Sequence, residues 1–200
     1  MRYLYLIVGR SGSGKTELTN ALAEHFNAKI VQSYTTREKR EPNETGHIFA
    51  TPKDYFKAKA QNLVVAETIF SGNYYWAQSD QIEECDLYVV DPKGVEDVRT
   101  AYENDIINKK PFVIKLSVSR KEVAKRMKKR GDSPNSIQTR LLNDDHVFKD
   151  FYYDAKIDAN ASKEEVAKAA ISIIQKQETQ KWIITTSWKE KPSQTQKNKQ

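Results

Sequence analysis

The sequence predicts an α/β protein in which helices cover both faces of a parallel sheet, giving three layers. Three observations predict this fold. Short apolar runs of strand length alternate with segments of helical spacing, as in proteins with parallel sheets. The first run, over residues 2–8, stops at a glycine-rich turn that leads directly into a helical segment. A chain of 200 residues is also long enough to form one domain with its own core and small inserted lobes.

In the first half of the chain, apolar runs bounded by turn residues predict strands over residues 2–8, 29–31, 63–70 and 73–77. Helical spacing of apolar residues predicts a helix over residues 15–26. A second helix should begin at Pro52, because Thr51 is a suitable cap and Asp54 is an early acid. The stretch over residues 33–46 is polar and rich in turn residues, so we expect loops there.

The second half of the chain continues the alternation. Strands are expected over residues 87–90, 111–118 and 155–158. Helices are expected over residues 95–102, 119–130 and 137–148, and from residue 162 onward. Ser119 and Glu122 form a capping-box pattern at the start of the basic helix, and residues 131–135 should form a loop. Residues 182–188 could form a short appended strand.

Composition and charge argue against several classes of protein. Cys85 is the only cysteine, so no intramolecular disulfide can form, and the longest apolar runs are too short to cross a bilayer. No signal-peptide pattern opens the sequence, and together these features favour the cytoplasm and no membrane association. The net charge is +6, but residues 179–200 hold five lysines and one glutamate, which leaves 28 basic against 26 acidic side chains in residues 1–178. A polar, lysine-rich tail is usually solvated, so we do not expect a nucleic-acid partner.

Residues 9–16 match the phosphate-binding pattern G-x-x-x-x-G-K-[ST] in full, between an expected strand and an expected helix. Glycines let backbone N–H groups turn toward phosphate oxygens at the N-terminus of a helix, where the partial charge is positive. We therefore predict that ATP binds here, with Lys15 bridging the outer phosphates and the Thr16 hydroxyl available to Mg²⁺. The predicted ATP-binding residues are Gly9, Arg10, Ser11, Gly12, Ser13, Gly14, Lys15 and Thr16.

A second motif follows in the turn-rich stretch, namely Ser33-Tyr34-Thr35-Thr36-Arg37-Glu38-Lys39-Arg40 and then Gly46, His47 and Phe49. Here the sequence resembles guanylate kinases, whose acceptor site carries S-x-T-T-R-x-x-R followed by a glycine and an aromatic pair. Two guanidinium groups, those of Arg37 and Arg40, suit a monophosphate dianion that must be held beside the anionic end of ATP. The alternative is a solvated loop of alternating charge.

The resemblance continues in Gly72-Asn73-Tyr74-Tyr75, where the family has G-N-Y-Y or a similar sequence. It implies that Tyr75 bonds the acceptor phosphate through its hydroxyl, although a hairpin aromatic could instead fill a small core. Asp91 ends an apolar run, and the resemblance implies that it faces the acceptor base. Asp91 could instead steer Mg²⁺ through water, or simply cap a turn or helix.

Three arginines, Arg126, Arg130 and Arg140, bracket the loop over residues 131–134, which resembles the mobile lid of the family. Such arginines would close over the phosphates, neutralise charge during transfer and exclude water. The alternative is a solvated basic face of a helix. The expected catalytic residues are Lys15, Arg37, Arg126, Arg130 and Arg140.

The resemblance covers residues 1–178 and implies a P-loop core with an inserted acceptor-binding lobe and an arginine-bearing lid. The core would comprise residues 1–32 and 81–178, the lobe that binds the nucleoside monophosphate residues 33–80, and the lid about residues 126–140. Residues 179–200 would form a basic tail that is flexible at its end.

Three departures from the family pattern concern the choice of substrate. His47 stands where a phosphate-binding tyrosine is expected, because the loop around it is shorter than usual. The guanine-reading glutamate, counted back from Gly72, falls on Ala66, and only a bulge would turn the neighbouring Glu67 to the same face. Ala77 replaces the hydroxyl residue that contacts the guanine carbonyl. The expected acceptor-binding residues are Ser33, Arg37, Arg40, His47, Glu67, Tyr75 and Asp91.

The resemblance implies transfer of the γ-phosphate of ATP to a nucleoside monophosphate, first of all GMP or dGMP, with Mg²⁺ as cofactor. A deoxynucleoside monophosphate kinase of broader or different base preference, including dTMP, fits nearly as well, because loss of base-contacting groups relaxes selection. A silent binding module is a further alternative, but Lys15 and Thr16 are both present. Another P-loop small-molecule kinase would not need the motif at residues 33–40.

Overall fold

A computed structural model of the protein describes residues 1–39, 41–70 and 72–188. The larger sheet is parallel throughout, with the strand order β6-β1-β7-β8. Its strands are β1 (Tyr3–Gly9), β6 (Leu87–Val89), β7 (Lys110–Ser117) and β8 (Ala155–Asp158). The predicted parallel core is confirmed, and β1 lies inside it between β6 and β7.

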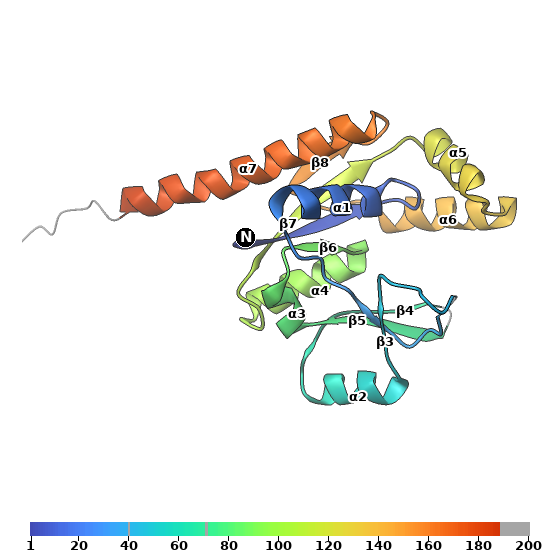
Figure 1. Ribbon diagram of the computed structural model, residues 1–200, viewed down its shortest axis with the longest axis horizontal. Helices are drawn as coiled ribbons and strands as arrows, with labels where there is room; N and C mark the ends of the chain where they lie inside the picture. The colour runs from blue at the N-terminus through green and yellow to red at the C-terminus, as the bar shows by residue number, and fades with distance from the viewer. Residues whose placement is uncertain (40, 71, 189–200) are drawn as a thin grey trace, which may run out of the picture.

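Helices cover both faces of the parallel sheet, which gives the three predicted layers (Figure 1). Every residue of β1 is buried, and alternate side chains enter two separate apolar clusters. Tyr5 and Ile7 pack in the cluster that includes α1 and α7, whereas Leu6 packs with α3 and α4. These helices are α1 (Lys15–Phe26), α3 (Ser79–Glu84), α4 (Pro92–Glu103) and α7 (Lys163–Trp188).

The strand expected over residues 29–31 is only an isolated bridge between Ile30 and Leu87, so this prediction is wrong. The N–H of Val31 donates to the carbonyl of Leu87 at 2.8 Å, and the chain then leaves for the second sheet. The pairing is therefore too short to form a regular ladder.

The second sheet has the strand order β3-β2-β5-β4. Its strands are β2 (Tyr34–Thr35), β3 (Ile48–Phe49), β4 (Val64–Phe70) and β5 (Asn73–Gln78). The pairing of β4 with β5 confirms the predicted strand pair. The helix α2 (Pro52–Ala60) begins where predicted, because the side chains of Thr51 and Asp54 each accept a hydrogen bond from the other's backbone N–H. In Figure 1 this second sheet and α2 lie below the parallel sheet.

Two helices precede β8, namely α5 (Arg120–Arg130) and α6 (Pro134–Val147). The last helix, α7, then continues to Trp188, so the short strand expected over residues 182–188 is wrong. Residues 163–188 contain no glycine or proline that would end the helix. The end of the expected basic tail, residues 189–200, lies outside the described residues. Among the helices described, none combines the length and apolar character that a membrane span requires.

Candidate active site

The loop between β1 and α1 is curled by its glycines. Gly12 and Gly14 have φ values of 76° and 92°, which side chains rarely tolerate. A Cβ on Gly9 would lie 2.7 Å from the Ser13 Oγ and 3.0 Å from the Leu116 backbone oxygen. These residues must therefore be glycine for the loop to close around the start of α1.

The side chain of Lys15 lies within this loop. Its Nζ donates hydrogen bonds to the carbonyls of Gly9 at 2.7 Å and Arg10 at 3.2 Å. Burial lowers the pKa of Lys15, while the nearby carboxylate of Asp144 acts in the opposite direction. The Ser13 hydroxyl is also buried and has no hydrogen-bond partner among the described residues. A partly buried ammonium and an unpaired hydroxyl at the N-terminus of a helix fit the binding of a phosphate chain.

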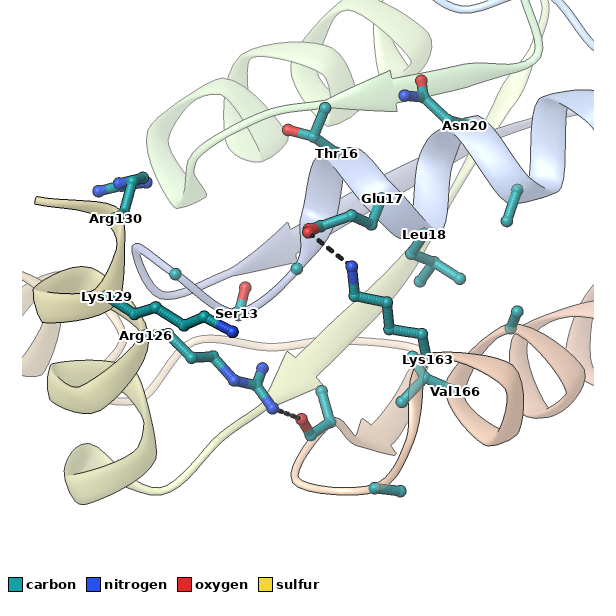
Figure 2. A pocket seen from close by; sticks show the side chains of 16 residues that line it. Ser13, Thr16, Glu17, Leu18, Asn20, Arg126, Lys129, Arg130, Lys163 and Val166 are labelled. Carbon is teal, nitrogen blue, oxygen red and sulfur yellow. Dashed lines mark hydrogen bonds and ion pairs between the residues drawn. The ribbon is translucent and has the colours of Figure 1, made fainter.

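A cavity of about 860 Å³ adjoins the loop and is shown in Figure 2. The loop and α1 form one wall, and residues of α5 and α7 form the other, including Arg126, Arg130 and Val166. Arg126 is held in place by two contacts, since its Nη2 donates to the Ala159 carbonyl at 2.9 Å and its Nε donates to Glu122 at 3.1 Å. The cavity has the size of a nucleotide-binding site.

The three predicted lid arginines do not all lie in the same place. Arg126 and Arg130 line the cavity beside the loop. Arg130 also forms an ion pair with Asp132. Arg140 is exposed on α6, and hydrogen bonding to Arg130 together with the charge of Arg140 lowers the pKa of Asp132. Asp132 therefore pairs with Arg130 at the turn between α5 and α6 and also senses the charge of Arg140.

Two carboxylates of α6 also contact the phosphate loop, and sequence reasoning missed both. Asp144 accepts a hydrogen bond from the Ser11 N–H at 2.9 Å. Asp145 pairs with Arg10 at 2.6 Å and also with Arg120. No local sequence pattern indicated these contacts, because they join distant parts of the chain; Ser11 and Asp144, for example, are 133 positions apart.

A second cationic cluster lies on the inserted sheet. The guanidinium of Arg37 contacts both carboxylate oxygens of Glu44, at 2.7 and 3.1 Å, and lies 5.4 Å from the centre of the Phe49 ring. Hydrogen bonds to Glu44, and then to Tyr75, raise the pKa of Arg37. His47 joins the cluster, with its ring centre 5.7 Å from that of Tyr75. The structure thus brings together Arg37, His47 and Tyr75, while Arg40 lies outside the described residues.

Asp91 is the N-cap of α4. Its Oδ1 accepts a hydrogen bond from the Gly94 N–H at 2.7 Å, as in the simple capping interpretation. The carboxylate also acts on Lys15, whose pKa it raises against the larger effect of burial. Asp91 is therefore a helix cap whose charge also influences Lys15.

The contacts of Glu67 turn it away from the face on which a base-reading residue was expected. Its carboxylate accepts hydrogen bonds from the Tyr55 hydroxyl at 2.6 Å and from Lys59 Nζ at 2.9 Å, both on α2. A register irregularity does occur in β4, but it lies before Ala66 and leaves Ala66 paired with Ala77. Both alanines are buried in the cluster with the core strands. Glu67 therefore faces α2, and Ala66 occupies the opposite face.

Comparisons with known proteins agree with this architecture. The model of a family described as "AAA domain" matches residues 6–149. A guanylate kinase of Paraburkholderia xenovorans is 32% identical over 70% of this chain and 64% of its own length. One of Cupriavidus metallidurans is 30% identical over 70% of this chain and 67% of its own length. The matched region thus spans about two thirds of the length of those relatives.

Among solved structures, a guanylate kinase from Anaplasma phagocytophilum has the same fold, with a TM-score of 0.61 and 16% identity over 88% of this chain and 86% of that chain. The parallel sheet, the glycine loop and the inserted second sheet define a P-loop α/β protein. Within that class, the chain belongs to the guanylate kinase family.

Proposed function

We propose that this protein transfers the γ-phosphate of ATP to a nucleoside monophosphate. The supporting observation is that the chain carries two separate cationic sites, one around Lys15 in the phosphate loop and one around Arg37 on the inserted sheet. Two polyanions can be oriented for transfer only if their charge is neutralised, and the acceptor phosphate needs no general base. Residues 33–80 would form the acceptor lobe and residues 126–140 the lid.

The donor would bind along the phosphate loop with its base in the adjoining cavity. Lys15 would exchange its two carbonyl partners for phosphate oxygens, and Arg126 and Arg130 would neutralise charge from α5. Mg²⁺ would be held chiefly by the phosphates, with the exposed Thr16 hydroxyl as a ligand and Asp91 acting through water.

The acceptor would place its phosphate at Arg37, His47 and Tyr75. Arg37 is held by Glu44, so a monophosphate dianion would compete with that carboxylate for the guanidinium. GMP and dGMP are the first acceptors to consider, because the curated relatives are guanylate kinases.

A broader base preference, including dTMP, is the second candidate. The observation that favours it is the orientation of Glu67 toward α2, with Ala66 and Ala77 on the opposite face. Fewer polar groups then remain to reject the wrong base.

The decisive experiment incubates the protein with ATP, Mg²⁺ and GMP, dGMP, dTMP, AMP, CMP or UMP in turn, and quantifies ADP and the nucleoside diphosphate. We expect equal amounts of both products with at least one acceptor. Absence of product with all six acceptors would contradict the proposal and favour a binding module. Steady turnover with a sugar acceptor alone would indicate a different small-molecule kinase.

A further inference from the structure

A pair of hydroxyl groups connects the two sheets. The Tyr88 hydroxyl in β6 lies 3.2 Å from the Ser33 Oγ, just before β2. Tyr88 is only 4% exposed and shares its buried cluster with Ala66 and Ala77, whereas Ser33 is half-buried. The pair therefore extends from the core at Tyr88 toward the surface at Ser33.

Tyr88 is an unusual residue for this position. Its neighbours in β6 are Leu87 and Val89, and a buried hydroxyl has a cost unless it is hydrogen-bonded. Within the described part of the chain, Ser33 is the hydrogen-bond partner shown for Tyr88. Burial raises the pKa of Tyr88 to about 12, so the phenol keeps its proton at neutral pH.

The proton count of the pair determines what it can offer a ligand. Two hydroxyls carry two protons, and the bond between them uses one. Because Tyr88 is enclosed and Ser33 is the partner shown for it, the Tyr88 hydroxyl must donate to the Ser33 Oγ, which leaves the proton of the more exposed Ser33 for a ligand. The Ser33 carbonyl also lies 3.3 Å from the His47 Nδ1, which connects this residue to the phosphate end of the acceptor site.

We infer that Tyr88 is a positioning residue that orients the Ser33 hydroxyl as a donor toward the acceptor base. This inference rests on the proposed function. A fixed donor favours a base that presents a carbonyl at the corresponding edge, as guanine, thymine and uracil do, over adenine and cytosine, which present an amino group there. Selection between these two groups of bases would then depend on a residue outside the recognised acceptor motif.

The test compares kcat/KM for carbonyl-bearing and amino-bearing monophosphates in Tyr88→Phe, Ser33→Ala and the double variant. Tyr88→Phe should lower the carbonyl-to-amino ratio about fivefold to tenfold through the acceptor KM, with kcat and the KM for ATP nearly unchanged. Ser33→Ala should lower the carbonyl-to-amino ratio of kcat/KM by a similar factor. The double variant should lower it no further than Ser33→Ala alone. The matched control is Tyr102→Phe, at a tyrosine partly buried against the same cluster.

The inference would be overturned if Tyr88→Phe left the carbonyl-to-amino ratio of kcat/KM unchanged, or if the two single effects on this ratio added up in the double variant. The proposed function would still stand in either case, provided that the wild-type protein phosphorylates a monophosphate. Wild-type protein that phosphorylates no monophosphate would overturn both. If Tyr88→Phe does not fold, Ser33→Ala still decides, because it removes only a half-buried hydroxyl. A full carbonyl-to-amino ratio in that variant would exclude the pair from base selection.

Discussion

Among single residues, Lys15 is the one on which the donor site most depends. Its ammonium is partly buried and, in the described structure, is hydrogen-bonded only to carbonyls of the loop. A phosphate chain would therefore meet a cation with no carboxylate in direct contact. Lys15→Ala should lower kcat about 100- to 1000-fold, as expected for loss of one charge-stabilising donor. ADP release measures the effect, and a melting curve checks the fold. Near wild-type turnover by Lys15→Ala would show that the loop does not stabilise the transferred phosphate.

Arg37 should matter for the acceptor rather than for ATP. Its guanidinium contacts both oxygens of Glu44, a bidentate geometry that an ammonium cannot reproduce. Arg37→Lys should therefore raise the KM for the monophosphate about tenfold or more, with the KM for ATP unchanged. Arg99→Lys is the control, because Arg99 pairs with Glu96 on α4. A larger effect on ATP than on the acceptor would contradict the assignment of this site.

At the scale of elements, α6 contacts the phosphate loop through its carboxylates. Asp144 accepts a hydrogen bond from the Ser11 N–H and places negative charge close to Lys15, where phosphate oxygens would bind. Asp144→Asn should therefore tighten ATP binding about tenfold, because the competing charge is removed. Calorimetric titration with ATP measures the change.

The control for this prediction is Asp150→Asn, at an exposed residue with a φ of 55°, which asparagine tolerates. It makes the same change of charge at a residue with no hydrogen bond or ion pair to the loop among the described contacts. Weaker ATP binding in Asp144→Asn would mean that the carboxylate supports the loop rather than competing with the nucleotide.

The strand β4 shows where element-level prediction from sequence failed. The strand itself was predictable from its apolar run and its Gly-containing turn, and so was the absence of a glutamate at position 66. The direction of Glu67 was not, because a bulge could have reversed it. Only the contacts with Tyr55 and Lys59 of α2 show which face it occupies.

In the whole molecule, the alternation of strands and helices could be predicted from the sequence, because each apolar run is bounded by turn or capping residues. The phosphate loop was readable for the same reason, since its glycines and Lys15 are adjacent in sequence. The contacts of Asp144 with Ser11 and of Tyr88 with Ser33 join residues separated by 133 and 55 positions, and no local pattern records them. These long-range pairs are the part of the site that required a structure.

The stability of the whole fold should depend on Asp86 at the start of β6. Burial disfavours its charge, but hydrogen bonds from the N-terminal amino group, Lys109 and the Lys29 N–H together lower the pKa of Asp86. A lowered pKa means that the stabilisation is complete above the unfolded pKa of about 4 and is lost as pH falls through the folded pKa.

Asp86→Asn should therefore lower the free energy of unfolding by about 1–3 kcal/mol at pH 7. The difference from wild type should shrink as the pH falls below about 4. Urea unfolding at pH 7 and pH 3 measures both quantities. An equal difference at the two pH values would show that the charge of Asp86 does not contribute.

In the proposed function, two anionic nucleotides bind side by side, one at the phosphate loop and one at the Arg37 cluster. The most direct measurement is calorimetric titration with a single molecule in which adenosine is joined through five phosphates to the nucleoside of the best acceptor. We expect one molecule bound per chain, at least about 100-fold more tightly than ATP or the monophosphate alone, with the gain reduced in both Lys15→Ala and Arg37→Lys. Binding no tighter than that of ATP alone, or a gain that survives in Arg37→Lys, would contradict it.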